Sequence, residues 1–328
     1  MKKTMFAVLM LLIVFIAVAA SYVKYALPDV GDAPDLKITI TPERVQHGEY
    51  LANHVTLCMD CHSTRDWNKF AGPMVDGTLG KGGEYFGEEV GFPGTFYSKN
   101  ITPANLKDWT DGEIFRAITT GVNKSGNALF PVMPYLYYGK MDKEDVYDII
   151  AYIRTLAPIE NKTPEHNINF PMNFIVNTIP TKAEPGQKPS RSDTLQYGAY
   201  LVNQAACMEC HTQVKKGQVI PELAFSGGRE FNMPNGKVSS ANITPDKGTG
   251  IGNWTAETFV ARFKAYNDPS TLPAMTPGQV NTIMPWGMFA GMDTADLRSI
   301  YAYLRTVKPM KNEVVHFVSA KDMKGEKK

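Results

Sequence analysis

The sequence is poor in cysteine and shows no excess of either charge. Only four of its 328 residues are cysteines, and they stand in two close pairs, so no thiol is spare for a structural disulfide or a lone nucleophile. The 34 lysines and arginines nearly balance the 33 aspartates and glutamates, for a formal net charge of +1, and no block of like charge runs along the chain. Nothing therefore suggests nucleic-acid binding, and any docking would depend on local patches.

A long apolar run is also scarce and occurs once, at the N-terminus. It covers residues 4–23 behind Lys2 and Lys3, and as a helix it would cross the roughly 30 Å hydrocarbon core. The lysines should stay cytoplasmic, which places the rest of the chain on the periplasmic face of an inner membrane. The alternative is a signal peptide cleaved around residues 17–19, which leaves a soluble protein in the same compartment.

The whole chain has the composition of folded protein, with 43% hydrophobic and 20% charged residues. It contains one unit twice, in residues 41–158 and 192–309. The motifs that recur in the same order are HGEYL (47–51) and YGAYL (197–201), CMDCH (58–62) and CMECH (207–211), NITP from 100 and 242, Trp-Thr from 109 and 254, VMPY (132–135) and IMPW (283–286), and the segments 141–158 and 292–309. Chance does not give six matches in one order, so we predict two tandem domains of the same fold.

The segment that closes each unit is predicted to be a helix. Asp142 and Asp293 are N-cap candidates, apolar residues then recur at helical spacing, and Pro158 and Pro309 lie just past the ends. The segments before each cysteine pair are also expected to be helical.

Other stretches are expected to be less regular. Residues 63–130 are rich in glycine and proline and should be mostly loop, with one helix near 110–120. Residues 159–191 hold five prolines and an apolar stretch at 168–176, which indicates a linker packed across both units. The chain after Val315 is expected to fray.

Both cysteine pairs belong to C-x-x-C-H, the attachment sequence of c-type haem. Zinc would need the pairs to converge on one metal, whereas they stand in separate copies of the unit, and a thioredoxin motif would need a βαβ pattern that is missing here. The thiols would form thioethers to haem vinyl groups, and the histidine would be the proximal iron ligand. The sequence therefore predicts two haem c groups, bound by Cys58, Cys61 and His62 and by Cys207, Cys210 and His211.

Methionine is the sixth iron ligand expected in an electron-carrying c-type haem, because its soft thioether favours Fe(II). Met133 and Met284 occupy matched positions, each followed by proline and an aromatic residue shortly before the closing helix. We predict that they complete the two iron sites. The chain has 16 methionines, and those competing with Met284 are Met275, Met288 and Met292.

Further residues recur in both units. Asn100, Asn242, Trp109 and Trp254 are candidate hydrogen-bond donors to haem propionates, and the alternative is that NITP is a turn and the tryptophans fill core. Structural roles are expected of three other sets: core packing for Met141 and Met292, ion pairs for Arg154 and Arg305, and solvated or capping positions for His47, His54, His166 and His316. For His54, which stands close before Cys58, a role near the first haem is the alternative.

These motifs resemble the membrane-bound dihaem or trihaem cytochrome c subunits of periplasmic alcohol- and gluconate-type dehydrogenases. The resemblance covers about residues 41–309 and is most specific in 130–156, in 242–255 and in the C-x-x-C-H sequences. It implies small helical cytochrome c domains with His/Met iron. Electrons would enter from a flavin- or quinone-containing dehydrogenase subunit and leave to ubiquinone or an oxidase. This chain differs in having two haem motifs, where alcohol-oxidising members usually have three, and an apparent anchor at its N-terminus instead of its C-terminus.

The expected fold is mainly α, with two tandem cytochrome c domains behind an N-terminal transmembrane helix. The expected segments are an anchor or signal (1–26), a tether (27–40), domain 1 (41–158), the linker (159–191), domain 2 (192–310) and a tail (311–328).

The expected function is respiratory electron transfer as a non-catalytic subunit of a membrane-associated dehydrogenase. The alternative is a free-standing anchored shuttle, or a cytochrome arm that feeds a terminal oxidase. The expected redox partner is accordingly a dehydrogenase subunit, a quinol-oxidising complex or a terminal oxidase. An enzyme such as a dihaem peroxidase or a thiosulfate dehydrogenase is disfavoured, because both units offer a Met-Pro ligand and no cysteine is spare to bind iron.

Overall fold

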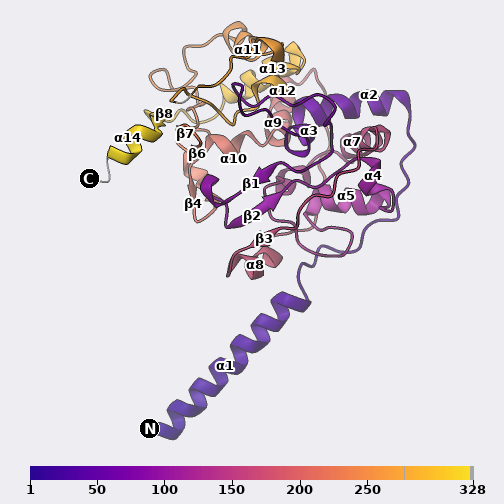
Figure 1. Cartoon of the computed structure of the whole chain (residues 1–328), viewed down its shortest axis with the longest axis vertical. Coiled ribbons are helices and arrows are strands. Elements are labelled where there is room, and N and C mark those ends of the chain that lie inside the picture. Colours follow the sequence, from indigo (N-terminus) through magenta and orange to yellow (C-terminus); the bar gives the residue numbers. More distant parts are fainter. Residues whose placement is uncertain (277, 326–328) are drawn as a thin grey trace. The chain divides into compact units, whose positions relative to one another are not determined.

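The protein is mainly helical, as expected (Figure 1). The computed structural model describes residues 1–276 and 278–325, so the last three residues of the expected tail lie outside the described part. The helices are α1 (Lys2–Tyr25), α2 (Pro42–Tyr50), α3 (Cys58–His62), α4 (Pro103–Leu106), α5 (Asp111–Thr120), α6 (Tyr135–Tyr138), α7 (Lys143–Thr155), α8 (Met172–Ile175), α9 (Thr194–Gln204), α10 (Cys207–His211), α11 (Ala256–Lys264), α12 (Trp286–Ala290), α13 (Thr294–Leu304) and α14 (Ala320–Gly325). The strands are β1 (Tyr85–Phe86), β2 (Gly94–Tyr97), β3 (Asn167–Ile168), β4 (Val214–Lys215), β5 (Gln218–Val219), β6 (Glu230–Met233), β7 (Gly236–Ser239) and β8 (Phe317–Ser319).

The described residues fall into two compact units, which differ from the two repeated sequence units. Each compact unit combines segments that lie far apart in the chain. The first unit is made of residues 1–38, 109–140 and 168–185. The second unit is made of residues 39–108 and 141–167 with the described residues of 186–328. The domain boundaries that the repeat indicates stay a prediction.

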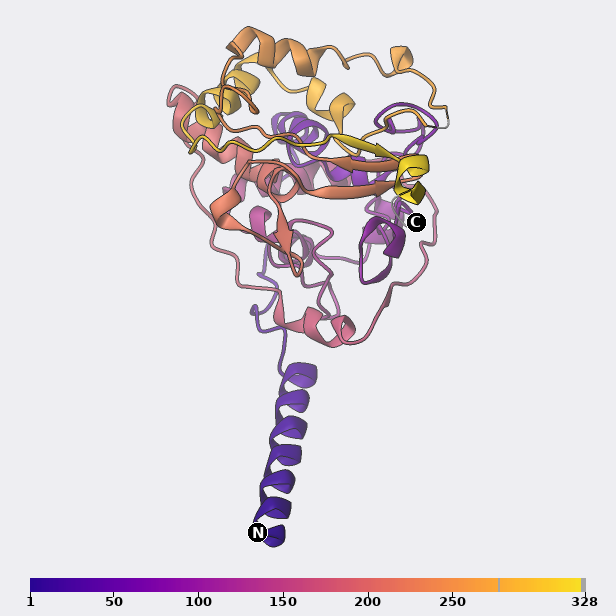
Figure 2. The same ribbon diagram turned by 90° about the vertical axis from the view of Figure 1, so that its left-hand side faces the viewer.

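In the first unit, α1 is a single apolar helix of 24 residues, none of them buried (Figure 2). At about 1.5 Å per residue it is roughly 36 Å long, enough for a hydrocarbon core of about 30 Å. No other helix in the described residues has the length and composition to cross a membrane. A membrane anchor and a signal sequence both fit this helix.

The helix expected near residues 110–120 is α5, and its two ends explain its length. Thr110 and Glu113 form a capping box at its start, in which each side chain accepts a hydrogen bond from the other residue's backbone N–H. Gly121 ends the helix in the left-handed conformation at φ 75°, which glycine adopts without steric cost. α5 then packs against α6.

The second unit is built on two matched helix pairs, α2 with α7 and α9 with α13. Gly48 and Gly198 allow each crossing, because a Cβ there would collide with the carbonyl of Asp148 or Ser299 on the facing helix. The predicted closing helices α7 and α13 are confirmed, with Asp142 and Asp293 at their N-caps. Their core residues are Val146, Ile149, Ile150 and Ile153 in α7 and Leu297, Ile300 and Leu304 in α13.

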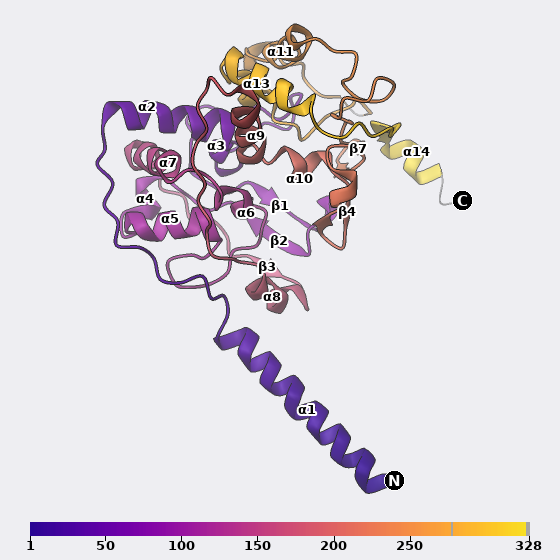
Figure 3. The ribbon, with the colours of Figure 1, turned by 180° about the vertical axis from the view of Figure 1, so that it is seen from behind.

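The C-terminal segment corrects one expectation. We expected the chain after Val315 to fray, but Phe317–Ser319 form β8, which pairs antiparallel with β7 beside β6. α14 follows it at the end of the described chain (Figure 3). Two adjacent apolar residues, Phe317 and Val318, were too short a signal to reveal a strand whose partner lies some 80 residues earlier, in residues 236–239.

Candidate haem sites

Each C-x-x-C-H sequence forms one short helix, α3 in the first copy of the sequence repeat (41–158) and α10 in the second copy (192–309). Residues three and four apart share a helix face, so both sulfurs and the histidine ring project from the same side. Leu57 and Ala206 stand directly before the first cysteine in the left-handed region, at φ 57° and 48°. Such a conformation is uncommon for residues other than glycine, and here both copies use it to start the helix.

The two histidine rings are held in the same way. Nδ1 of His62 lies 2.6 Å from the carbonyl oxygen of Lys99, and Nδ1 of His211 lies 2.8 Å from that of Ala241. A carbonyl only accepts, so Nδ1 carries the hydrogen and the other ring nitrogen, Nε2, keeps its lone pair. Burial lowers the pKa of both imidazoles, and the hydrogen bond to the carbonyl opposes this shift. Neutral rings with Nε2 available are what an iron ligand requires.

A glycine packs against each backbone segment that carries an accepting carbonyl, Gly82 against Lys99 and Gly227 against Ala241. The backbone N–H groups of Gly82 and Gly227 donate to the backbone carbonyls of His62 and His211, both at 2.8 Å. Their φ angles are 71° and 72°, and a Cβ on either would come within 2.5 Å of the segment that carries the accepting carbonyl. Only glycine therefore lets this segment lie close enough to receive the histidine.

The NITP motif fixes the same segment on its other side. Asn100 follows the accepting carbonyl, and its side-chain oxygen accepts from the N–H and the hydroxyl of Thr102 at 2.9 and 2.8 Å. Its amide nitrogen donates to the carbonyl of Ile159 at 2.8 Å, just past α7.

The second copy repeats every one of these bonds. Asn242 accepts from the N–H and hydroxyl of Thr244 at 3.0 and 2.8 Å and donates to the carbonyl of Met310 at 2.7 Å. We call each set a histidine brace, because it fixes the segment whose carbonyl accepts from the histidine. The two braces are Asn100, Thr102 and Ile159, and Asn242, Thr244 and Met310. These bonds support the interpretation of NITP as a turn, instead of a propionate-binding motif, because the asparagine side chains are hydrogen-bonded to the backbone.

We expect Asn242→Ala to lower the free energy of unfolding by about 1–3 kcal/mol, because the buried N–H of Thr244 loses its acceptor and the Met310 carbonyl loses the nearer of its two donors. Asn253→Ala is the matched control, since that exposed side chain donates one bond, to the carbonyl of Lys247. The control should change stability by less than about 0.5 kcal/mol. Denaturant unfolding of the mature protein measures both, and equal losses would contradict the role of the brace.

An acidic residue inside each C-x-x-C pairs with an arginine, which the sequence did not reveal. Asp60 lies 3.0 Å from Arg65, whose guanidinium also donates to the carbonyls of Gly72 and Ala71 at 2.8 and 2.7 Å. Burial raises the pKa of Asp60, and the Arg65 charge opposes that rise.

The second copy uses another part of the chain for the same purpose. Glu209 pairs at 3.2 Å with Arg229, at the end of the loop that leads into β6. Because Arg65 and Arg229 are not in equivalent positions of the repeat, aligning the two copies could not have found this pairing.

The cysteine thiols are desolvated by the surrounding protein. Burial raises the pKa of Cys61 to about 12 and that of Cys207 to about 12, and it also raises the pKa of Cys58 and Cys210. Unmodified, these thiols are therefore neutral at physiological pH. Two thiols and a preset imidazole on one helix face fit covalent attachment of haem c with iron.

The expected methionine ligands lie in loops with the same local shape. Met133 precedes α6 and Met284 precedes α12, and in each the methionine carbonyl accepts from the N–H two residues on at 2.8 Å. Met284 belongs to the same unit as His211, whereas Met133 belongs to the first unit and His62 to the second. Both iron-ligand pairs stay predictions. Met141 and Met292 are 1% exposed, as expected of core residues.

The other recurring or titratable residues have structural partners. Arg154 and Arg305 make a matched contact, donating to the carbonyls of Leu106 and Gly252 at 2.8 and 2.7 Å, and their expected ion pairs stay a prediction. His54 Nδ1 lies 2.7 Å from the carbonyl of Met288, which fits the expected capping role. His47 lies 2.8 Å from Asp148, in a group with the geometry of a metal site. Arg44 and Lys188 already neutralise that group, by ion pairs to Asp148 and Asp145.

Two tyrosines cross between the copies in a reciprocal arrangement that we call the tyrosine interlock. Tyr50 of the first copy donates to the Asp296 carboxylate at 2.8 Å and accepts from the N–H of Asp293 at 3.0 Å. Tyr200 of the second copy donates to Asp145 at 2.6 Å and accepts from the N–H of Asp142 at 3.0 Å. Each tyrosine therefore caps the closing helix of the other copy.

Burial, helped by the neighbouring carboxylates, raises the pKa of both interlock tyrosines, so their hydroxyls stay protonated as donors. Arg191 and Lys188 lie 3.1 and 2.6 Å from Asp296 and Asp145 and supply the countercharge. The carboxylates are 1% exposed, whereas the side chains of Lys188 and Arg191 are 36% and 56% exposed, so each ion pair joins a buried carboxylate to a cation that reaches water.

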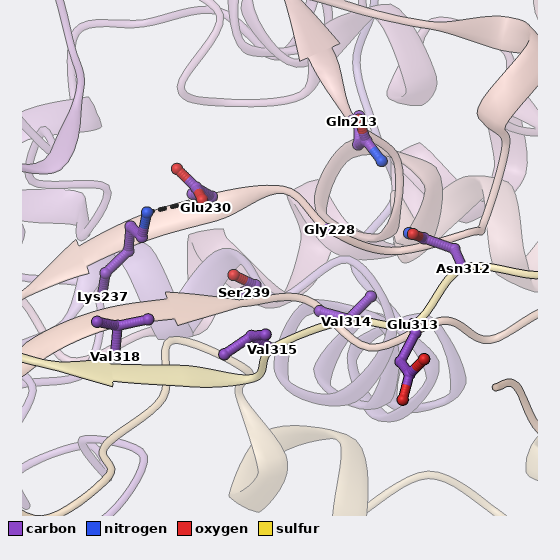
Figure 4. A pocket seen from close by; sticks show the side chains of 10 residues that line it. All are labelled: Gln213, Gly228, Glu230, Lys237, Ser239, Asn312, Glu313, Val314, Val315 and Val318. Carbon is purple, nitrogen blue, oxygen red and sulfur yellow. Dashed lines mark ion pairs between the residues drawn. The ribbon is translucent and has the colours of Figure 1, made fainter.

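An open pocket lies beside the second C-x-x-C-H turn, between the C-terminal segment and strands β6 and β7 (Figure 4). Lys237 and Glu230 form an ion pair at 2.7 Å along its wall. Asn312, on the opposite side, donates to the carbonyl of Ser226 at 2.9 Å. None of the residues that line it is an expected haem ligand, so it is separate from the haem-binding groups.

Comparison with known proteins agrees with this chemistry. Residues 195–308, which hold the second C-x-x-C-H sequence and Met284, match the family model described as cytochrome c. The described chain is thus mainly helical, with a cytochrome c domain and one N-terminal apolar helix.

Several relatives carry similar names. The chain is 28% identical over 283 residues to the fructose dehydrogenase cytochrome subunit of Gluconobacter japonicus, covering 82% of this chain and 53% of that protein. It is 26% identical over 237 residues to the cytochrome c subunit of an alcohol dehydrogenase (quinone) of Gluconobacter oxydans, covering 67% and 46%. It is 27% identical over 201 residues to a diheme cytochrome c-type protein of Cereibacter sphaeroides, covering 58% and 64%. The expected resemblance is confirmed, and the chain spans about half the length of the two dehydrogenase subunits.

Proposed function

We propose that this chain carries electrons through two covalently bound c-type haems, as the electron-transfer subunit of a membrane-associated dehydrogenase. It does so on the periplasmic face of the inner membrane, held there by α1. The observation that carries the proposal is the duplicated C-x-x-C-H helix, in which each histidine donates Nδ1–H to a backbone carbonyl fixed by a brace. The first copy lies outside the segment that matches the cytochrome c model, yet it repeats these contacts one by one, which supports a second haem.

The chain's own residues would position the haems and set their properties. The thioethers of Cys58 and Cys61, and of Cys207 and Cys210, would hold each group at its helix, and His62 and His211 would bind the irons through Nε2. The iron supplies one-electron redox chemistry, so no proton or atom has to be transferred by the protein. Within the second unit, the tyrosine interlock joins the segments of the two copies that carry His62 and His211, which favours passage of an electron from one haem to the other.

The haem number can be counted directly. We expect the mature protein to carry two haems per chain by alkaline pyridine spectroscopy, and the double variant Cys58→Ala/Cys61→Ala to carry one that stays attached on denaturation. The reciprocal variant Cys207→Ala/Cys210→Ala should also carry one. Two covalent haems left in either variant would contradict the assignment of its site.

The choice between a dehydrogenase subunit and the free-standing shuttle or oxidase arm needs the native membrane. The full-length protein with a C-terminal tag should be solubilised gently and purified. A dehydrogenase that co-purifies in fixed ratio, and whose substrate reduces both haems, is the expected result. Reduced haems that are reoxidised by a co-purifying oxidase complex, with no dehydrogenase present, would favour the alternative.

A further inference from the structure

The linker holds an apolar surface next to the end of α1. From Asn167 to Pro180 no residue is charged, and the segment forms α8 followed by a short 3₁₀ turn, Val176–Thr178. Val176 is buried beneath it, whereas Phe170 is 85% exposed and Ile175 is 41% exposed. We call exposed Phe170 and Ile175, together with half-buried Met172 and Phe174, the linker patch.

The linker patch and α1 belong to the same unit, and they touch. α1 packs against both α8 and the turn that follows it (Figures 1 and 3). Residues 2–19 of α1 are exposed throughout, and its first half-buried positions are Ala20 and Val23. The contact is therefore at the C-terminal end of α1, which is the periplasmic end if α1 spans the membrane with Lys2 and Lys3 inside.

The end of α1 has the features of a membrane–water interface. Tyr22 and Tyr25 are exposed there, with Lys24 between them. Tyrosine rings concentrate at the headgroup level of a bilayer, and lysine extends its ammonium toward the polar region. A segment that packs on this last turn lies at the same depth. An uncharged surface with exposed phenylalanine and isoleucine matches the boundary between headgroups and acyl chains.

We propose that the linker patch lies in the periplasmic leaflet and binds lipid, as a second membrane contact beside α1. This inference rests on the proposed function, because it requires α1 to remain in the membrane. With both α1 and the linker patch in contact with the membrane, the rest of the first unit could not tilt freely about the end of α1. An anchor helix followed by a tether alone would not restrict this tilt.

Site-specific fluorescence quenching by lipid tests this. All four native cysteines are expected in thioethers, so a cysteine added to the full-length chain is the one reactive thiol. Phe170→Cys and Ile175→Cys would be labelled with a small fluorophore and reconstituted in phosphatidylcholine nanodiscs. The nanodiscs would contain no nitroxide lipid, lipid with a nitroxide near the headgroup, or lipid with a nitroxide deep in the acyl chain. Val14→Cys, exposed in the middle of α1, reports the anchor, and Val315→Cys, exposed in the second unit, is the aqueous control. Comparing the lipid mixtures for one variant cancels quenching by haem.

We expect the nitroxide lipid to reduce fluorescence at residues 170 and 175 at least twofold and to leave residue 315 unchanged. If residue 14 is quenched by deep nitroxide lipid but residues 170 and 175 behave like residue 315, the linker patch does not touch the bilayer and the inference is overturned. Shielding of residues 170 and 175 from both lipid and aqueous iodide would mean that protein covers the patch, which also overturns it. If residue 14 is not quenched either, the anchor itself is absent, which is a failure of the proposed function.

Discussion

Replacing Met284 by alanine should lower the reduction potential of one haem and open its iron to carbon monoxide, while the other haem keeps its properties. The thioether is a soft ligand that stabilises Fe(II), so its loss favours Fe(III) and leaves a position for an added ligand. The potential should fall on the order of 0.1–0.3 V, part of the roughly 0.8 V range over which axial ligands set haem potentials. Met133→Ala should have the same effect on the other haem. Spectroelectrochemical titration, with carbon monoxide added to the reduced protein, measures both properties.

The matched control is Met292→Leu. Met292 is a nearby methionine buried in the core at the start of α13, and leucine keeps its volume and polarity. This variant should keep both potentials and should not bind carbon monoxide. If Met288→Ala opened the iron and Met284→Ala did not, our assignment of the sixth ligand in the second copy would be wrong.

The sequence predicted those elements whose signals lie within a short segment. The helices α7 and α13 follow from an N-cap aspartate, an apolar period and a closing proline, all within about 17 residues. The C-x-x-C-H sequences likewise name their chemistry without any knowledge of the fold. Repetition added weight, because two copies of a local pattern are two independent observations.

The acceptors of the histidine Nδ1–H bonds could not be predicted, because a backbone carbonyl leaves no mark on residue identity. Lys99 and Ala241 share no chemistry, and only their carbonyls matter. The NITP motif beside them was visible in the sequence, and its asparagine could have served a propionate or a turn. The distance from Asn100 to Ile159 along the chain hid the answer, since the partner lies beyond α7.

The tyrosine interlock was hidden for another reason. Tyr50 and Tyr200 occupy the same position in the HGEYL and YGAYL motifs. A tyrosine that recurs on a helix usually packs in the hydrophobic core, so its position alone does not indicate a hydrogen bond to the other copy. Its partners, Asp296 and Asp145, belong to the other copy, so the pairing depends on how the copies meet in the second unit. Comparing the copies shows what they share, but it cannot show which residue of one faces which residue of the other.

The interlock should contribute strongly to stability. In the double variant Tyr50→Phe/Tyr200→Phe, each buried carboxylate loses a hydrogen bond and each closing helix loses an acceptor for its N-cap N–H. Hydrogen bonds to charged groups contribute about 1.5–3 kcal/mol each, so the double variant should lose roughly 3–6 kcal/mol of unfolding free energy. Each single variant should lose about half of this, because contacts at separate sites add.

The control for the interlock is Tyr85→Phe. Its hydroxyl also donates to a carboxylate, that of Glu89 at 3.1 Å, but at the exposed surface, where the change should cost less than about 0.5 kcal/mol. The interlock variants should keep both haems and their iron spectra, since neither tyrosine is an expected ligand. Urea unfolding followed by tryptophan fluorescence and by haem absorbance separates the two effects. If both single interlock variants and the double variant unfold at the same midpoint as the parent protein, the reciprocal hydrogen bonds do not hold the copies together, and apolar packing does.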